Sequence, residues 1–232
     1  VYLINCSNYY FLSNNITSTN AVYSRSIQLV YYSTNNTFIS NNLFTTNINS
    51  VGLALESNSE NNTFISNIIN STGNGIYLNT SGNIFNNTVI KVGGTSYLNL
   101  LSASNGSNFS NTTFLEDLGS VRYNSLFVAS VNKNISKDKL NISSNNVFLN
   151  ATYLSFLNTS AEIKLNNLSF VNPKVIVDLS DSGTFTNCVD CNIVNYSGNI
   201  LTFNVSHFTI YKANEASSLL INFSNPTPLS GT

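Results

Sequence analysis

The seven-residue sequence NNTFISN occurs twice in this chain of 232 residues, at positions 35–41 and again at 61–67. The two copies start 26 residues apart. Self-similarity at a fixed period of this size is typical of a solenoid, in which stacked repeats bury a core that no single repeat could bury alone. The repeat therefore restricts the fold before any other feature is considered.

Two apolar patterns recur with this period. A phenylalanine position recurs at spacings of 27, 26, 21 and 24 residues, and it is occupied by Phe11, Phe38, Phe64, Phe85 and Phe109. An alternating apolar pair recurs at Ile27/Leu29, Leu53/Leu55, Ile76/Leu78 and Leu98/Leu100. Short alternating segments indicate strands, here two in each period. One strand layer per 21–27 residues predicts a parallel β-helix of about five right-handed coils.

Asparagine, which occurs 44 times, suits the corners of such a coil. It tolerates the left-handed backbone region better than most residues, so it can occupy sharp bends between strands. Its side-chain amide can also bond to its own copy one coil away and form a ladder. We therefore interpret NNTFISN as one strand with its corner, repeated because neighbouring coils must match.

The segment from NNTFISNN through GLALESNSENNTFISNIINSTGNGIYLNTSGNIFNN resembles the right-handed β-helix repeats called NosD-like, which are common in archaeal and bacterial surface proteins. The resemblance covers about residues 1–130 and implies the fold. It implies little about function, because such coils serve lyases, hydrolases, adhesins and passive scaffolds. The copper handling linked to some NosD-like proteins needs soft ligands. It does not transfer to a chain with no Met and one His.

The period disappears after about Asn134, and alternating strands separated by turn signals follow at roughly ten-residue spacing. This pattern predicts an all-β fold: a right-handed parallel β-helix over 1–133, then an antiparallel, Ig-like β-sandwich over 134–215. The lysine-rich NKNISKDKLN between them is typical of an exposed linker. Residues 216–232 read as a tail, a linker or a donated strand (Leu219 to Phe223). The second region resembles a β-sandwich module that follows β-helices in archaeal surface proteins.

Only 8% of residues are charged and the formal net charge is −1, so no basic surface for nucleic acid is expected. No apolar run reaches the ~18 residues of a membrane span. The sequence opens directly on a strand, VYLI, with no signal peptide, which is typical of a processed or excerpted chain. An uncapped first coil predicts a covering partner: earlier coils of a longer chain, or a second copy in a homo-oligomer or filament.

The sequon N-x-S/T occurs 18 times, against roughly 11 expected by chance from the composition. The excess predicts an N-glycosylated, extracellular cell-surface protein, although biased composition and turn chemistry could also produce it. The candidate asparagines are Asn5, Asn15, Asn35, Asn61, Asn70, Asn79, Asn86, Asn105, Asn108, Asn111, Asn134, Asn141, Asn150, Asn158, Asn167, Asn195, Asn204 and Asn222.

Catalytic residues are not predicted. A β-helix glycosidase needs paired carboxylates, and the one candidate pair, Glu56 and Glu60 in ESNSE, reads as solvated corner charges without an acidic partner one period away. The single histidine, His207, is expected at a sheet surface. No second histidine is available for a nucleophile–base pair.

The cysteines predict a local disulfide. Cys188 and Cys191 form CVDC, which is expected to join a hairpin tip in an oxidising compartment. A zinc site would need two more ligands, and we find none at the usual spacing, so no metal or other cofactor is predicted beyond covalent N-glycans. Cys6 is expected to be a buried apolar position of the first coil.

Three functions are compatible with these observations. The leading one is a non-catalytic extracellular structural protein: an envelope or S-layer component, a filament or an adhesive scaffold. The second is a carbohydrate-binding module that uses exposed aromatics as stacking platforms, such as Tyr9, Tyr10, Tyr31, Tyr32 and Tyr77. The third is a carbohydrate-active enzyme. A flat row of stacked aromatics would favour the carbohydrate-binding module. A cleft that contains two carboxylates would favour the enzyme.

Overall fold

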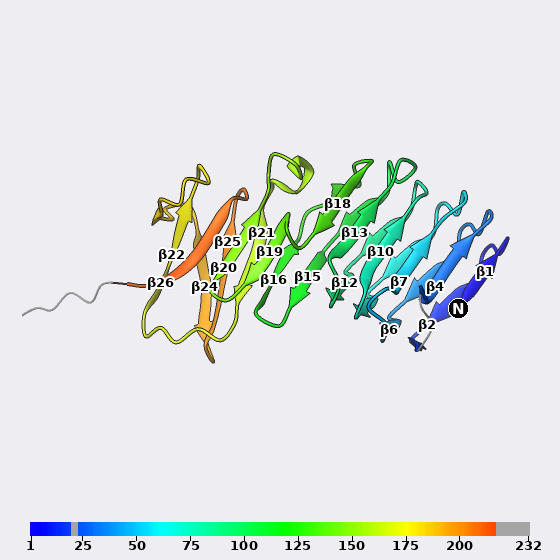
Figure 1. Cartoon of the computed structure of the whole chain (residues 1–232), viewed down its shortest axis with the longest axis horizontal. Helices are drawn as coiled ribbons and strands as arrows, with labels where there is room; N and C mark the ends of the chain where they lie inside the picture. Colours follow the sequence, from blue (N-terminus) through cyan, green and yellow to red (C-terminus); the bar gives the residue numbers. More distant parts are fainter. Residues whose placement is uncertain (20–22, 217–232) are drawn as a thin grey trace, which may run out of the picture.

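The structure is a computed structural model that describes residues 1–19 and 23–216. It is one elongated body of strands lying side by side, from β1 at one end to β22 and β26 at the other (Figure 1). In the described ranges the only helix is the 3₁₀ turn η1 (Ser155–Leu157), which is too short to cross a membrane. The predicted tail strand and Asn222 lie outside the described residues.

Three sheets form the solenoid, each with five parallel strands. Sheet A contains β1 (Tyr2–Ile4), β4 (Arg25–Val30), β7 (Val51–Leu55), β10 (Asn74–Leu78) and β13 (Ser96–Leu100). Sheet B contains β2 (Tyr10–Leu12), β5 (Thr37–Ile39), β8 (Thr63–Ile65), β11 (Ile84–Asn86) and β14 (Asn108–Ser110). Sheet C contains β3 (Asn15–Ser18), β6 (Asn42–Thr45), β9 (Ile68–Ser71), β12 (Val89–Val92) and β15 (Thr112–Glu116).

This arrangement confirms the predicted fold class, a parallel β-solenoid with antiparallel sheets. Since five strands in a sheet are joined by four complete turns, the chain makes about four turns from the first to the last, against the predicted five coils. Each turn carries three strands rather than the predicted two. The third strand was missed because a single bend of about two residues separates it from the second.

The phenylalanine column is confirmed as the centre of the core. The strand register pairs each ring position with its copy one turn on. The ring centroids lie 4.7, 4.8, 4.8 and 4.4 Å apart along Phe11, Phe38, Phe64, Phe85 and Phe109. These spacings are close to the ~4.8 Å between paired strands, so the backbone repeat itself sets the stack. The Ile/Leu pairs of sheet A form a second buried column.

The corners between sheets use left-handed backbone. Just before sheet B the left-handed position is filled by Asn8, Asn35, Asn61, Gly82 and Gly106. Between sheets B and C it is filled by Ser13, Ser40, Ser66, Asn87 and Asn111. Only Gly, and to a lesser degree Asn and other small polar residues, adopts this conformation cheaply, which explains the composition of the repeat.

Inside the corners, asparagines that are all buried except Asn14 form two ladders, one on either side of the phenylalanine stack. In one, the Asn36 amide nitrogen donates to Asn62 Oδ1 at 3.0 Å, and the Asn62 amide nitrogen donates to Asn83 Oδ1 at 3.2 Å. In the other, Asn14 donates to Asn41 at 2.9 Å and Asn41 to Asn67 at 3.0 Å. The predicted amide ladder is therefore present twice, and both flanking asparagines of NNTFISN take part.

Antiparallel strands close the solenoid on all three sides. β18 (Lys133–Ser136) pairs with β13, β17 (Phe127–Val128) with β14, and β16 (Gly119–Tyr123) with β15. Phe127 continues the ring stack, 5.0 Å from Phe109. The closing strands therefore cover the last turn without interrupting the core.

Sheet C then runs on beyond the solenoid through β21 (Ala161–Leu165), β25 (Ile200–Val205) and β24 (Asn192–Ser197), all antiparallel. A fourth sheet, D, contains β19 (Leu140–Ser143), β20 (Asn146–Leu149), β26 (Ile210–Glu215), β22 (Pro173–Asp178) and β23 (Thr186–Asn187). Phe203 of sheet C meets Tyr211 of sheet D at 6.1 Å, within one buried cluster that extends from Ile27 to Ala213. An Ig-like strand order for this part remains a prediction.

Two local predictions are wrong. The lysine-rich segment is not an exposed linker: it forms β18 and β19, and Ile135 and Leu140 within it are fully buried. The predicted boundary between 133 and 134 thus falls inside a strand. Cys6 is half-buried rather than buried, because the corner after β1 holds its sulfur near the Ile4 carbonyl oxygen instead of in the core.

Candidate functional site

The two candidate catalytic glutamates are tied into neighbouring turns. The Glu56 carboxylate lies 3.2 Å from the Arg25 guanidinium and accepts a bond from the Gln28 amide at 3.0 Å. Glu60 accepts from the Ser81 hydroxyl at 2.8 Å. Both side chains are half-buried, so the expectation of solvated corner charges is wrong. Their bonds join one turn to the next, and this gives them a structural role.

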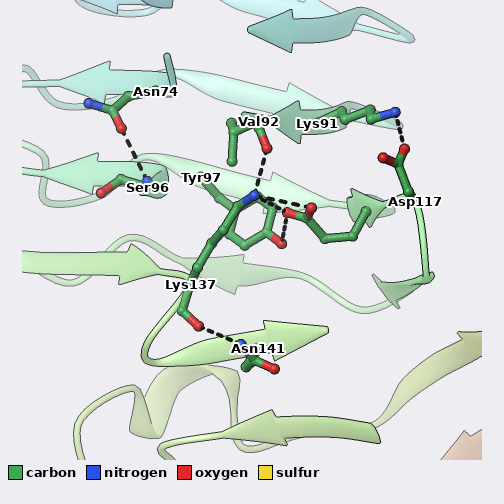
Figure 2. Close-up of polar contacts among 9 residues, drawn as sticks. Asn74, Lys91, Val92, Ser96, Tyr97, Asp117, Lys137 and Asn141 are labelled. Carbon is green, nitrogen blue, oxygen red and sulfur yellow. Dashed lines mark hydrogen bonds and ion pairs between the residues drawn. The ribbon is translucent and has the colours of Figure 1, made fainter. Parts of the chain in front are cut away.

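A second polar cluster joins the last turn to the closing strands (Figure 2). Buried Tyr97 of β13 donates its hydroxyl to Glu116 of β15. Lys137 lies 2.9 Å from the same carboxylate and donates to the Val92 carbonyl oxygen at 2.7 Å. Burial, and then the bond to Glu116, raises the pKa of Tyr97 far above its usual range, so the phenol stays neutral. Through these two contacts, Lys137 attaches the segment after β18 to the last turn of the solenoid.

Beside this cluster, Lys91 and Asp117 form an ion pair at 2.6 Å on the surface (Figure 2). The hydrogen bond and the charge of Lys91 lower the pKa of the Asp117 carboxyl. Exposed pairs of this kind contribute little to stability. Because the Tyr97, Glu116 and Lys137 groups are all bonded within the chain, the junction offers no free acid or base.

Asp178, at the end of β22, is a buried carboxylate held by the following turn. It accepts backbone N–H bonds from Ser180 at 3.1 Å, Ser182 at 3.2 Å and Gly183 at 2.6 Å. Burial acts to raise the pKa of Asp178, but these bonds outweigh it and lower the pKa below the ordinary 3.8. The carboxylate is satisfied by the protein and organises the turn of residues 179–183.

We expect Asp178→Asn to destabilise the fold at neutral pH and much less in acid. A carboxyl whose folded-state pKa is depressed contributes stability above its unfolded pKa, and this contribution is lost as the pH falls through the folded value. Urea unfolding at pH 7 and at about pH 2.5 measures the difference between wild type and variant. A difference that did not shrink in acid would contradict the assignment.

The outer face of sheet A carries a groove of about 580 Å³ beside the turns that lead into it. Tyr23 and Tyr77 contribute aromatic surface, and amides and a guanidinium line the rest, from Asn49, Asn74, Asn99 and Arg25. Of the five tyrosines proposed as stacking platforms, only Tyr77 lines this groove. The others are exposed, but they form no row: Tyr10 is followed one and two turns on by Thr37 and Thr63.

The CVDC loop and the histidine, which are distant in sequence, meet at one end of sheet C. Cys188 and Cys191 are joined by a disulfide, with their Cα atoms 5.4 Å apart. His207 Nδ1 lies 3.5 Å from Asp190 Oδ2, and the Ser206 hydroxyl lies 3.1 Å from that same nitrogen. A catalytic relay needs the acid and the nucleophile on opposite ring nitrogens, so this trio has the residue types of a relay without its geometry.

The sequence interpretation missed the link between His207 and CVDC. The signal in the sequence is the spacing C-x2-C-x15-H; the expectation of no ligand at the usual spacing was based on the absence of a second histidine. The contact itself depends on β24 and β25 being antiparallel neighbours, with Asn192 opposite Asn204, and spacing alone does not reveal that pairing.

Comparisons of this chain with models of protein families, with curated proteins and with solved structures found no match.

The sequon asparagines lie at the surface. All 17 in the described ranges have exposed or half-buried side chains, and eight of them are exposed: Asn5, Asn15, Asn35, Asn61, Asn105, Asn158, Asn167 and Asn195. Among the described residues, the five buried asparagines all belong to the ladders (Asn36, Asn41, Asn62, Asn67 and Asn83), and none of them begins a sequon. Within both copies of NNTFISN, the first asparagine is thus exposed and the second is buried.

Proposed function

We propose that this chain is a non-catalytic structural protein of the cell surface, with N-linked glycans on its outer face. One observation carries the proposal: every sequon asparagine in the described ranges lies at the surface, and no buried asparagine there begins a sequon. A glycan is bulky and must point to solvent, so a sequon asparagine can accept one only at the surface. The positions of the described sequons are those that a glycosylated solenoid needs.

The build of the molecule supports a scaffold role. A continuous ring stack and two amide ladders couple each turn to the next, and this favours a stiff rod over a mobile catalytic surface. Glu56, Glu116 and Asp178 are each bonded within the protein. The resemblance to NosD-like repeats supports an envelope or S-layer component, a filament or an adhesin, in an archaeal cell or a bacterial one.

Glycopeptide mapping of protein isolated from its native cells tests this proposal. We expect glycan at several corner sequons, with Asn35, Asn61 and Asn105 the best placed because their side chains are exposed. Peptides that contain the ladder asparagines serve as the internal control and should carry none at those positions. If every sequon were bare, the main argument for a cell-surface protein would be lost.

Carbohydrate binding is the second candidate, and the groove on sheet A favours it. A tyrosine face combined with planar amides suits a neutral polyhydroxylated ligand, and the Arg25 charge there is balanced by Glu56. A scaffold that also bound glycans would act as an adhesin. The lack of an aromatic row makes this role secondary to the structural one.

A further inference from the structure

Four metal-ligating side chains converge at one end of sheet C. Cys188 and Cys191 immediately precede β24, and His207 comes two residues after β25. Because these strands are antiparallel neighbours, the start of β24 and the end of β25 lie side by side at the same end of the strand pair. Asp190, between the two cysteines, faces both groups: its Oδ1 is 3.3 Å from Cys188 Sγ and its Oδ2 is 3.5 Å from His207 Nδ1.

These separations are those of ligands around one tetrahedral ion. Zinc bonds of ~2.0–2.3 Å place neighbouring ligand atoms roughly 3.3–3.8 Å apart. The 3.3 and 3.5 Å contacts of Asp190 fall in this range, and the ligand atoms of Cys188, Asp190 and Cys191 lie within 4.8 Å of one another. His207 lies beside Asp190 and outside this group of three, so a four-ligand site requires its ring to rotate, and the two sulfurs to separate once the disulfide is opened.

We propose that the chain, when its disulfide is reduced, binds one Zn²⁺ through Cys188, Asp190, Cys191 and His207. Two thiolates and an imidazole select a soft or borderline cation over Mg²⁺ or Ca²⁺, and a carboxylate is an accepted fourth zinc ligand. The order C-x2-C-x15-H matches the first three ligands of the C-x2-C…H…H zinc pattern, and Asp190 takes the place of the missing second histidine. The scaffold function does not require this site, which stays closed in the oxidising surroundings of a cell-surface protein until the disulfide is reduced.

The site is controlled by redox state. In the disulfide form neither sulfur can act as a thiolate. A dithiol reductant supplies two electrons and two protons: the S–S bond of the protein breaks, two thiols form, and the reductant becomes a disulfide. Binding of Zn²⁺ then releases those two protons to solvent. Asp190 and His207 are 50% and 42% exposed, so cation and reductant can both reach the site.

Zinc titration of the oxidised and the reduced chain tests the proposal. The full chain, carrying Cys6→Ser to remove its third thiol, is reduced anaerobically with a phosphine that is then removed. Zn²⁺ is titrated in competition with a chromophoric chelator, and Co²⁺ binding is followed by its thiolate charge-transfer and ligand-field bands. We expect one ion per reduced chain, tetrahedral Co²⁺ bands, and at least ~100-fold weaker binding by the oxidised chain.

Variants separate the four-ligand site from simple binding by two thiols. His207→Ala and Asp190→Asn should each weaken Zn²⁺ binding by about tenfold or more, and Ser206→Ala, which touches both side chains without being a ligand, should not. Equal affinity of the reduced and oxidised chains would overturn the proposal. So would full affinity in the His207→Ala variant, because the thiols alone would then account for binding. Circular dichroism checks that each variant is folded.

Discussion

Phe64→Ala is expected to lower the free energy of unfolding by about 3–5 kcal/mol, the range for truncating a fully buried aromatic ring. Phe64 lies in the middle of the stack, 4.8 Å from Phe38 on one side and 4.8 Å from Phe85 on the other. The strand register fixes the backbone spacing, so neighbouring rings cannot close the gap. Chemical denaturation followed by far-UV circular dichroism measures the loss.

Phe44→Ala is the matched control, because this ring comes from the same repeat region and is only half-buried on sheet C. It should cost clearly less than Phe64→Ala. Phe64→Leu, which refills part of the space, should recover much of the lost stability. Equal losses for Phe64→Ala and Phe44→Ala would show that the stack is not the centre of the core.

Asn62→Ala is expected to cost a similar amount, about 3–5 kcal/mol, for a different reason. Oδ1 of this buried side chain accepts from the backbone N–H of Asn36 at 2.9 Å. Its amide nitrogen donates to the carbonyl oxygens of Ser33 at 2.9 Å and Ser59 at 3.0 Å, and to Asn83 Oδ1 at 3.2 Å. Alanine leaves several buried polar groups without partners, each worth about 1–3 kcal/mol.

The neighbouring position provides the control for the ladder. Asn61 is exposed and has a left-handed backbone with φ 58°, so Asn61→Gly should change stability little. The same denaturation experiment compares the two variants. If Asn62→Ala were as mild as Asn61→Gly, the ladder would contribute no net stability and the asparagine content would reflect corner chemistry alone.

The sequence predicted the features that repeat. The spacing of Phe11, Phe38 and Phe64 defined the stack, and NNTFISN indicated both the strand and the ladder. These predictions succeeded because neighbouring turns must match in register, so the same contact is encoded several times. The third strand escaped notice because its apolar positions, such as Leu43 and Ile69, follow the second strand after one short bend.

Contacts that occur only once could not be predicted in the same way. The bonds of Lys137 to Glu116, and of Asp190 to His207, each depend on an antiparallel pairing after the period has ended. Nothing in the repeat encodes that pairing. The burial of Ile135 and Leu140 was also missed. The lysines around them made the segment look exposed, and the pairing that buries it is not encoded in the repeat.

The central claim is that this protein is a component of the cell surface. Surface labelling of intact cells is its most direct test. Native cells are treated with a membrane-impermeant amine reagent, and modification is read by mass spectrometry at the exposed Lys164. A known cytoplasmic protein and a sample of lysed cells are the controls. We expect labelling of this chain in intact cells to the extent seen after lysis. Labelling only after lysis would contradict the account.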